Sequence, residues 1–561
     1  MATHEVFNQS RPFTGFNLFD ANRPLQDALR LHAGALDTAR LQSLGAEAGS
    51  ADMQSHARLA NAHGPVLHTH DGVGQRVDEV EFHPSYHALM ARALHHGLHG
   101  TPWTGPALSH VERAAAFMLF TEVEPSVLCP VSMSYAVTPA LRANPALQAA
   151  WGPKLAATAY DARFLPMPGK SAVTMGMGMT EKQGGSDVRA NTTQAQRDGS
   201  DAWGERYKLT GHKWFFSAPM CDAFLVLAQT QRGSSAGLSC FFLPRWLPSS
   251  AHEGTLNGIQ IQRLKHKLGN QANASSEVEF QDAIAWRVGD EGRGVPQILA
   301  MGALTRLDCA LGTAGLMRQA LSLALHHTAQ RQAFGKRLID QPLMKNVLAD
   351  LALESEAATA LALRLAVAVD RTEHGRDAHE QVMRRLLTPV AKFWICKRGA
   401  AFAQEAMECL GGNGYVEADG EGVMARIYRE MPVNSIWEGA GNIMALDLLR
   451  VFRPRDGGAD VAAALERELA PSRGAHLALD RCAASVLHQI GHAELAEPQA
   501  RRLAREVALV MQAALLHRQA PVAVFAAFCD SRLAAASDVF GLLGAGHDLD
   551  ALIHRAMPWT P

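Results

Sequence analysis

Segments with the character of β-strands are confined to one block of this 561-residue chain, and that confinement limits the folds it can adopt. Between Ser171 and about Trp286, short β-branched or aromatic runs alternate with turn residues. The runs are Trp214–Phe216, Phe224–Leu227, Cys240–Leu243 and Val278–Phe280. A parallel α/β sheet would need strands and helices in alternation along the chain. The sequence therefore predicts a small antiparallel β domain.

Helix-forming sequence flanks this block on both sides. Apolar residues recur at helical spacing before residue 170, and Ala- and Leu-rich stretches dominate after Gly294. The stretches with the strongest helical character after Gly294 are 304–333, 342–371 and 381–410. Residues 452–458 are typical of a linker, and residues 459–561 again favour helices.

We therefore predict a mostly α protein with a central antiparallel β domain. The expected domains are an N-terminal helical domain (1–170), the β domain (171–286), a helical bundle (287–452) and a further helical domain (456–561). A chain of this length is too long for one compact core.

Composition excludes several classes of protein. With 53 Lys and Arg against 55 Asp and Glu, the net charge is -2, so the whole chain is not an electrostatic nucleic-acid binder. The most apolar helical stretch, 359–369, is interrupted by Arg364 and would not span a bilayer. The eight cysteines contain no C-x-x-C pair, and no secretory signal opens the chain. We expect a reduced, cytoplasmic protein without a metal site.

Two glycine-rich runs do not fit a dinucleotide-binding fingerprint. Gly176–Gly178 lacks the third glycine, and residues 410–415 follow a helix instead of a strand. The hydroxyls and glycines of residues 177–187 suit a loop that approaches a planar polar ligand or a phosphate. The same residues could also form a loop that merely joins two domains.

Five segments, in order, resemble the acyl-CoA dehydrogenase flavoprotein family over roughly residues 90–450. They are Met179-Thr180-Glu181 with Gly185-Ser186-Asp187; Gly211–Ser217; Lys267-Leu268-Gly269 with Val278–Asp282; Arg331–Gly335 with Gln341; and Gly411–Tyr415 with Ile436–Gly439. The resemblance implies that family's fold, with FAD as cofactor.

The runs 176–187 and 431–439 are similar to the AidB branch of this family, the alkylation-response flavoproteins of bacteria. An N-terminal extension and about a hundred residues after the family core are also typical of that branch. This resemblance implies a FAD-containing tetramer that binds duplex DNA, protects it from alkylation damage and has at most weak acyl-CoA (isovaleryl-type) dehydrogenase activity.

The family reaction removes a proton α to a thioester carbonyl and passes a β-hydride to flavin N5. The resemblance places the carboxylate base at Glu438. Some members carry the base before an arginine in the first long helix of the C-terminal half, but here that position is Thr305, which cannot serve. Glu438 could instead only order the start of a helix.

For FAD, the resemblance implies contacts from residues in five parts of the chain. These residues are Met177, Met179, Thr180, Gly185, Ser186, Phe215, Phe216, Ser217, Arg331, Phe334, Gln341, Gly411, Gly412, Ile436, Trp437, Gly439 and Asn442. Thr180, Ser186 and Ser217 would offer hydroxyls, Phe215 and Phe216 would flank the isoalloxazine, and Arg331 would pair with the pyrophosphate. An aromatic pair in a strand is more often plain core.

The resemblance also implies partners. The Leu410-Gly411-Gly412 loop would complete the FAD site of a neighbouring subunit, which requires a homodimer or homotetramer. Duplex DNA would bind the C-terminal extension, although residues 455–561 hold ten arginines, no lysine and twelve acidic residues. Candidates for phosphate contacts are Arg501, Arg502, Arg505 and Arg518; a solvated surface stripe is the more common meaning of such a run.

Three functions remain open from the sequence. The first is an AidB-like flavoprotein that shields DNA or destroys the alkylating agent at the flavin. The second is a catabolic short branched-chain (isovaleryl-type) acyl-CoA dehydrogenase with a structural C-terminal extension. The third is a non-catalytic protein that keeps FAD as a structural element.

Overall fold

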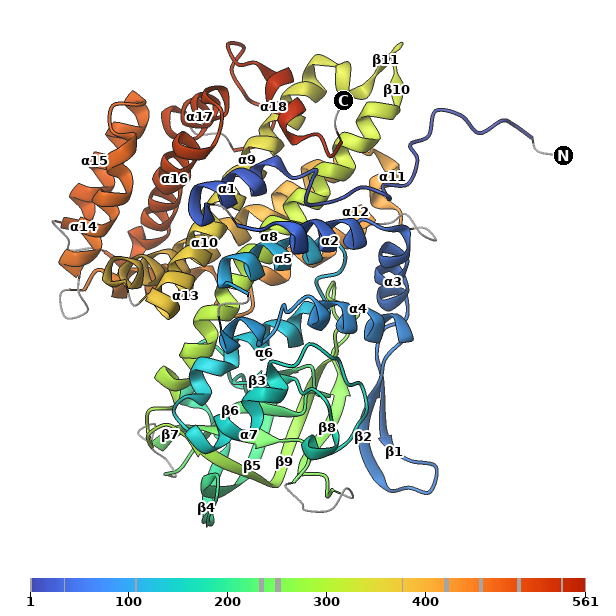
Figure 1. Ribbon diagram of the computed structural model, residues 1–561, viewed down its shortest axis with the longest axis vertical. Coiled ribbons are helices and arrows are strands. Elements are labelled where there is room, and N and C mark those ends of the chain that lie inside the picture. Colours follow the sequence, from blue (N-terminus) through green and yellow to red (C-terminus); the bar gives the residue numbers. More distant parts are fainter. Residues whose placement is uncertain are drawn as a thin grey trace. The chain divides into compact units, whose positions relative to one another are not determined.

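The computed structural model describes residues 3–34, 36–105, 108–231, 237–247, 254–375, 377–417, 423–453, 458–491, 496–535 and 538–559. The chain forms two compact units (Figure 1). Unit 1 comprises residues 1–54, 110–123 and 306–561, and unit 2 comprises residues 55–109 and 124–305.

Unit 2 is built around a seven-stranded sheet. Its strands are β3 (Met175–Gly178), β4 (Gln194–Asp201), β5 (Gly204–Ser217), β6 (Ala223–Gln229), β7 (Leu238–Pro244), β8 (Ile259–Leu264) and β9 (Ser275–Val288). The pairings β6–β4–β5–β9–β7–β6 close into a ring, while β3 adds to β6 and β8 adds to β9. Every one of the four predicted strand runs lies inside one of these strands.

Aromatic side chains fill the interior of this sheet. The rings of Phe216 and Phe224 lie 4.3 Å apart, and Phe216 also meets the edge of Phe280. All three are buried, as are all residues of β6 and β7. Strands buried on both faces lack polar alternation, which explains why β6 and β7 are continuous apolar runs in the sequence.

Two features of unit 2 differ from the sequence-based expectation. β3 pairs with β6 in parallel, so the domain is antiparallel in most but not all of its pairings. Residues before 170 were expected to be helix and loop, but β1 (Val66–His70) and β2 (Arg76–Glu81) form an antiparallel hairpin.

Helices complete unit 2. They are α4 (Pro84–His95), α6 (Leu128–Leu141) and α7 (Pro145–Leu155). α6 packs on α4, α7 and β3, and the Ser134 hydroxyl accepts a hydrogen bond of 2.9 Å from the Met175 amide. This bond fixes the start of the strand that leads into the first family-like segment.

In the parts of unit 1 that the structure describes, helices are accompanied by one short hairpin, β10 (Gln332–Ala333) and β11 (Lys336–Arg337). Its helices up to residue 451 are α1 (Arg23–Ala33), α2 (Ala39–Ala48), α5 (His110–Thr121), α9 (Pro342–Gly375), α10 (Ala378–Glu408), α11 (Gly412–Tyr415), α12 (Val423–Asn434) and α13 (Gly441–Val451). The chain segments that bridge the two units along the sequence include α3 (Ala51–Ala62) and α8 (Gly294–Gln330).

The C-terminal helices belong to the same compact unit as the bundle. They are α14 (Gly458–Leu469), α15 (Leu477–Gly491), α16 (Ala500–Gln519), α17 (Val522–Phe528) and α18 (Leu549–Ala556). α16 packs on α9, α10, α13 and α15, and its residues from Val507 to Leu516 are buried. A helix covered in this way supports the bundle, and its exposed residues lie near its two ends.

The predicted fold class, helices around a central β domain with additional C-terminal helices, is confirmed. The four-domain division stays a prediction, and most of the predicted linker, residues 454–457, lies outside the described residues. Among the helices that the structure describes, none is long and apolar enough to cross a membrane.

Candidate functional site

The loop that follows β3 in unit 2 is fixed by backbone hydrogen bonds. The Asn191 side-chain amide donates to the Met179 carbonyl at 2.9 Å, and the Trp214 amide donates to the Thr180 carbonyl at 2.8 Å. Glu181 and Gly184 exchange two backbone hydrogen bonds of 3.1 and 3.2 Å. This loop is therefore an ordered turn, as a ligand-contacting loop requires.

A buried ion pair anchors the same loop from beneath. The Lys213 ammonium lies 2.7 Å from a Glu181 carboxylate oxygen, and both side chains are fully buried. The Thr193 hydroxyl donates to that oxygen at 2.6 Å, and Lys213 also donates to the Leu227 carbonyl at 2.8 Å. A buried pair is stable only when further hydrogen bonds satisfy both charged groups, as here.

The surroundings keep this pair ionised at neutral pH. Burial alone would raise the pKa of Glu181, but the Lys213 charge and hydrogen bonds from Lys213, Thr193 and Thr192 lower it to about 2. Burial lowers the pKa of Lys213 to about 8, against the opposing attraction of Glu181.

The glycines of β3 have a packing role. A Cβ atom on Gly176 would lie 2.5 Å from the Phe224 ring, and one on Gly178 would lie 2.6 Å from the Phe216 ring. Only glycine permits this close approach. The two glycines therefore let β3 lie against the aromatic core. Contact with a ligand is left to the loop that follows β3.

Three hydroxyl groups near this loop have no hydrogen-bond partner within the described part of the chain. They belong to Thr180, Ser186 and Ser217, and none of these residues is fully buried. Gly185 brings its backbone against Thr180, since a Cβ there would lie 2.6 Å from the Thr180 hydroxyl. Free hydroxyl donors on an ordered loop fit the polar edge of a flavin and its phosphates.

The two phenylalanines of β5 face opposite sides of the strand. Phe215 is 51% exposed, and the Lys265 ammonium lies 4.8 Å from the centre of its ring. Phe216 is fully buried in the core. Phe215 is thus the ring available to a ligand, whereas Phe216 shapes the sheet beneath. Met177 is buried on β3, and Met179 is half-buried.

In unit 1, Glu438 lies on a turn between α12 and α13. Its φ of 58° and the φ of 104° at Gly439 place both residues in the left-handed region. Such a conformation costs a glutamate about 1–2 kcal/mol and persists only where the surroundings enforce it. The Glu438 side chain is half-buried.

Two cations enforce this turn. The Lys392 ammonium, on α10 and only 1% exposed, donates to the carbonyls of Trp437 at 2.8 Å and Gly439 at 2.5 Å. The Arg306 guanidinium donates to the Glu438 carbonyl at 2.9 Å and pairs with Asp447 at 2.8 Å. Three consecutive carbonyls thus accept hydrogen bonds from cations, which fixes the backbone of this turn relative to α10.

The neighbours of Glu438 have distinct environments. The Trp437 indole donates to the Asn434 side chain at 3.1 Å, while Ile436 is 64% exposed. Gly439 has no room for a side chain, because a Cβ would lie 2.6 Å from Met444. Asn442 is exposed on the first turn of α13.

The segment Arg331–Gln341 forms a second cluster of predicted FAD residues. The Gln341 amide donates to the Ala333 carbonyl at 2.9 Å, and Arg331 donates to the carbonyl of Asn8. Asn8 also receives a hydrogen bond of 2.8 Å from the Gln332 amide, so the N-terminal segment clamps this hairpin. Phe334 is 99% exposed at the tip, with a φ of 51°.

The glycine loop after α10 is exposed. Gly411 has a φ of 61°, and no atom lies within 4 Å of a Cβ built on Gly411 or Gly412. The following Tyr415 is 77% exposed. The prediction that this loop meets the FAD of another subunit stays a prediction, and the open surface leaves room for it.

The four arginines proposed for DNA do not form one free stripe on α16. The Arg502 guanidinium pairs with Glu506 at 2.7 Å, and the half-buried Arg505 lies over the Trp394 ring. Arg501 is exposed and reaches the Asn442 side chain at 3.5 Å. Arg518 is exposed near the other end of the helix, about 25 Å away at 1.5 Å per residue.

Sequence reasoning missed the buried residues that hold both groups in place. Lys213 and Glu181 sit inside family-like segments, but nothing in the sequence shows that they form an ion pair. Lys392 lies 46 residues before Glu438 in an unremarkable helix. Its one sequence cue is a lysine at an otherwise apolar position of α10, since Val390, Ala391 and Phe393 are all buried.

Replacing Lys213 by methionine should destabilise unit 2 by about 3–5 kcal/mol, because Glu181 would be left as an unpaired buried charge. The double variant Lys213→Met/Glu181→Gln should recover a large part of the loss. The free energy of unfolding in urea at pH 7 measures both.

The same pair predicts a pH dependence with a definite sign. The pKa of Glu181 is about 2 in the folded chain against 4.5 ordinarily, so its stabilisation is complete above pH 4.5 and is lost as the pH falls towards 2. The stability difference between the native protein and Glu181→Gln should shrink over that interval. A difference that stays constant would contradict the assignment.

Replacing Lys392 by methionine should loosen the Glu438 turn, because two carbonyls lose their donor at about 1–3 kcal/mol each. Hydrogen exchange of the amides in residues 436–441 should become faster. Lys345→Met, which removes an exposed pair with Asp550, is the control and should leave that exchange unchanged. Native-like protection in Lys392→Met would show that Lys392 does not hold the turn.

Comparisons with known families cover most of the chain. Residues 8–162 match the adaptive response protein AidB N-terminal domain. Residues 176–283 match the acyl-CoA dehydrogenase middle domain, and residues 292–452 match the acyl-CoA dehydrogenase C-terminal domain. Glu438, Lys392 and Arg306 all lie in the last match.

Individual relatives give the same result. AidB of Escherichia coli (strain K12), whose name describes it as a candidate acyl-CoA dehydrogenase, is 50% identical over 460 residues, which is 81% of each chain. The structure of Caenorhabditis elegans ACDH-11 in complex with C11-CoA has a TM-score of 0.84 at 27% identity and covers 96% of this chain and 95% of its own. A protein named Bd2924, in its apo form, has a TM-score of 0.81 at 30% identity and covers 92% of this chain and all of its own.

The family resemblance of the five segments is therefore confirmed, and so is the AidB-like branch. The family's cofactor is FAD, which agrees with the free hydroxyls of the β3 loop and the open ring of Phe215. On these matches, the chain belongs to the acyl-CoA dehydrogenase family of FAD-dependent oxidoreductases, in its AidB-like branch.

Proposed function

We propose that this protein is an AidB-like flavoprotein that binds duplex DNA, protects it from alkylation damage and retains a weak acyl-CoA dehydrogenase activity. The observation that carries the chemical part is the Glu438 turn, in which Lys392 and Arg306 hold three successive carbonyls. The resemblance to AidB along the chain, including the N-terminal domain match, supports the biological part.

Glu438 is proposed as the base that removes the proton α to a thioester carbonyl. When bound, FAD supplies the acceptor for a hydride from the β carbon. The chain's own contribution is to hold a single carboxylate at a fixed position, since a base must lie within hydrogen-bond reach of the proton it takes. The enforced left-handed backbone at Glu438 provides that position without relying on the flexible side chain alone.

Residues of both units are proposed to hold FAD. In unit 2 they are the hydroxyl residues Thr180, Ser186 and Ser217 with the Phe215 ring, and in unit 1 the segments around Glu438 and Arg331. Arg331 already donates to the Asn8 carbonyl, so a pyrophosphate would have to share or displace that bond. An arginine can do so, because it carries five N–H donors.

Self-association is proposed from the exposed apolar residues near these segments. Phe334, Tyr415 and Ile436 are 99%, 77% and 64% exposed, respectively. Apolar side chains exposed to this extent would be covered if they formed part of a contiguous patch at an interface with another chain. A homodimer or homotetramer in which the Gly411–Gly412 loop reaches a partner's FAD would cover such residues.

The isovaleryl-type alternative is not favoured. A catabolic enzyme of that type with a merely structural extension does not account for the match of residues 8–162 to the AidB N-terminal domain. The non-catalytic alternative is an outcome of the flavin-reduction experiment below.

DNA binding is proposed through phosphate contacts of α16 without base readout. Arg501, Arg502 and Arg518 are exposed, whereas Arg505 is half-buried against Trp394 and contributes less. Arg502 must loosen its pair with Glu506 to reach a phosphate. An exposed pair of this kind costs little to break, because water and salt screen it.

Flavin reduction tests the chemical part. Anaerobic mixing of the FAD-loaded protein with isovaleryl-CoA should bleach the flavin slowly, and Glu438→Gln should slow bleaching by about 100- to 10,000-fold. Glu466→Gln, an exposed carboxylate of unit 1, is the control and should bleach at the native rate. Equal rates in the native protein and Glu438→Gln would reject Glu438 as the base, and no bleaching in either would favour the non-catalytic alternative.

Salt-dependent duplex binding tests the DNA part. The triple variant Arg501→Ala/Arg502→Ala/Arg518→Ala should weaken binding to all duplex sequences alike and lower the slope of log affinity against log salt by about 2–3. A triple alanine variant of exposed arginines outside α16 (Arg30, Arg197 and Arg263) serves as the control. Unchanged affinity in the α16 variant would remove these arginines from the interface.

A further inference from the structure

The N-terminal segment of unit 1 makes a run of hydrogen bonds that the proposed function does not use. Residues 8–11, called the N-terminal strap below, lie against the end of α8 and the start of the β10–β11 hairpin. The strap and these elements are more than 300 residues apart in the sequence. Both belong to unit 1.

Asn8 is joined to the first strand of the hairpin by a pair of hydrogen bonds. Its side-chain oxygen accepts from the Gln332 amide at 2.8 Å, and its side-chain nitrogen donates to the Gln332 carbonyl at 2.9 Å. The side chain therefore satisfies both backbone polar groups of Gln332, as a neighbouring strand would. Asn8 has a φ of 55°, in the left-handed region that asparagine adopts more readily than most residues.

The next two residues fasten the strap to α8. The Ser10 hydroxyl lies 3.0 Å from the His327 Nδ1 atom, and the His326 Nε2 atom donates to the Arg11 carbonyl at 2.8 Å. The Arg11 amide donates to the Gln330 side chain at 3.1 Å. Burial lowers the pKa of both histidines, so neither adds a positive charge here at neutral pH.

The strap holds Arg331 by one nitrogen. The Nη1 atom of this guanidinium donates to the Asn8 carbonyl. Within the described part of the chain, its Nε and Nη2 atoms have no hydrogen bond or ion pair, and the side chain is half-buried. The remaining N–H groups form the fork that binds two oxygens of a phosphate. An arginine that is already anchored has less rotamer freedom to lose when it binds an anion.

The strap also reaches the glycine loop after α10. The Gln9 side-chain oxygen accepts a hydrogen bond of 3.4 Å from the Asn413 side chain, and the N-terminal segment passes beside α11 (Figure 1). Asn413 directly follows Gly411 and Gly412, which are also predicted to contact FAD. The strap therefore touches two predicted FAD segments from distant parts of the sequence.

We propose that the N-terminal strap is a positioning element of the cofactor site, which holds Arg331 ready to receive the pyrophosphate of FAD. This role rests on the FAD contact proposed above for Arg331. The Asn8 carbonyl takes one N–H group of the guanidinium and leaves the others for phosphate oxygens, so the strap and the cofactor do not compete. Asn8 itself is a positioning residue, because it acts through Arg331 and the hairpin.

The dissociation constant of FAD, measured by equilibrium dialysis of the FAD-loaded, full-length protein, tests this role. Asn8→Ala removes both side-chain bonds to Gln332 and should weaken FAD binding about tenfold. Arg331→Met should weaken it by about 10- to 100-fold, because charge-assisted bonds to phosphate are lost. Glu5→Gln, an exposed carboxylate just outside the strap, is the control and should leave the affinity unchanged.

The double variant Asn8→Ala/Arg331→Met separates positioning from a general loss of structure. If the strap acts through Arg331, the double variant should bind FAD within about twofold of Arg331→Met alone, whereas independent effects would multiply. Hydrogen exchange of the Gln332 amide should be faster in Asn8→Ala. The far-ultraviolet circular dichroism of each variant verifies that the helical fold is retained.

Unchanged FAD affinity in Asn8→Ala, beside a loss in Arg331→Met, would overturn the positioning role and leave the proposed contact of Arg331 intact. Losses that multiply in the double variant, or native-like exchange of the Gln332 amide in Asn8→Ala, would also overturn it. Unchanged affinity in Arg331→Met would remove the proposed FAD contact itself, and the role of the strap with it.

Discussion

The functional reading of this protein depends on one backbone constraint, the left-handed turn at Glu438. A glutamate at a φ of 58° is unfavourable by itself. Here the almost fully buried Lys392 donates to the carbonyls of the residues before and after Glu438, and Arg306 donates to the Glu438 carbonyl itself. The free energy of these charge-assisted hydrogen bonds offsets the local strain. The result is a glutamate whose backbone is fixed on a helical scaffold, which suits the role proposed for Glu438 in proton abstraction.

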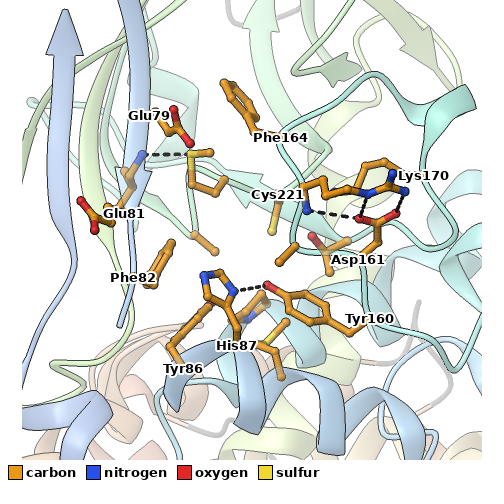
Figure 2. A pocket seen from close by; sticks show the side chains of 18 of the residues that line it. Glu79, Glu81, Phe82, Tyr86, His87, Tyr160, Asp161, Phe164, Lys170 and Cys221 are labelled. Carbon is orange, nitrogen blue, oxygen red and sulfur yellow. Dashed lines mark hydrogen bonds and ion pairs between the residues drawn. The ribbon is translucent and has the colours of Figure 1, made fainter. Parts of the chain in front are cut away.

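Unit 2 uses the same principle for the loop after β3. Its exposed hydroxyls are positioned by buried groups that never meet a ligand, namely the Glu181–Lys213 pair and the Thr193 hydroxyl. The register of β5 shifts between Lys213 and Phe216, so that both of these residues are buried while Phe215 is exposed. In both units, therefore, buried charged groups fix the positions of a few more exposed residues. Residues of the segment that matches the AidB N-terminal domain have another role, because they form part of the wall of a cavity in unit 2 (Figure 2).

Much of the fold was accessible from the sequence for a physical reason. The predicted helices 304–333, 342–371 and 381–410 correspond to α8, α9 and α10, and most of their ends agree within a few residues. Long runs of Ala and Leu with periodically placed polar residues strongly favour helices. The start of α8 at Gly294 was the exception. The β1–β2 hairpin was missed because its strands are short, polar and half exposed. The parallel pairing of β3 with β6 depends on contacts far apart in sequence, which no local pattern reveals.

The residues of the candidate site likewise fall into those that the sequence could indicate and those that only the tertiary structure reveals. Glu438, Thr180 and Ser217 could be predicted as site residues because they lie inside family-like segments, and their roles stay predictions. The groups that hold them, Lys392, Arg306 and Lys213, exert their effect through tertiary contacts, and a lysine in a helix is ordinarily a surface residue. The arginines of α16 show the reverse case: the sequence suggested a common face, while ion pairing and aromatic packing distinguish Arg502 and Arg505 from the freely exposed Arg518.

Exchange of the α-hydrogen of an acyl-CoA thioester with solvent deuterium is the most direct measurement of the central claim, since it follows the proton itself and does not require hydride transfer. The account predicts that the FAD-loaded protein incorporates one or two deuterons at the α carbon of isovaleryl-CoA, as detected by mass spectrometry. Failure to exchange in the native protein, or exchange that persists unchanged when the Glu438 carboxylate is removed, would contradict it.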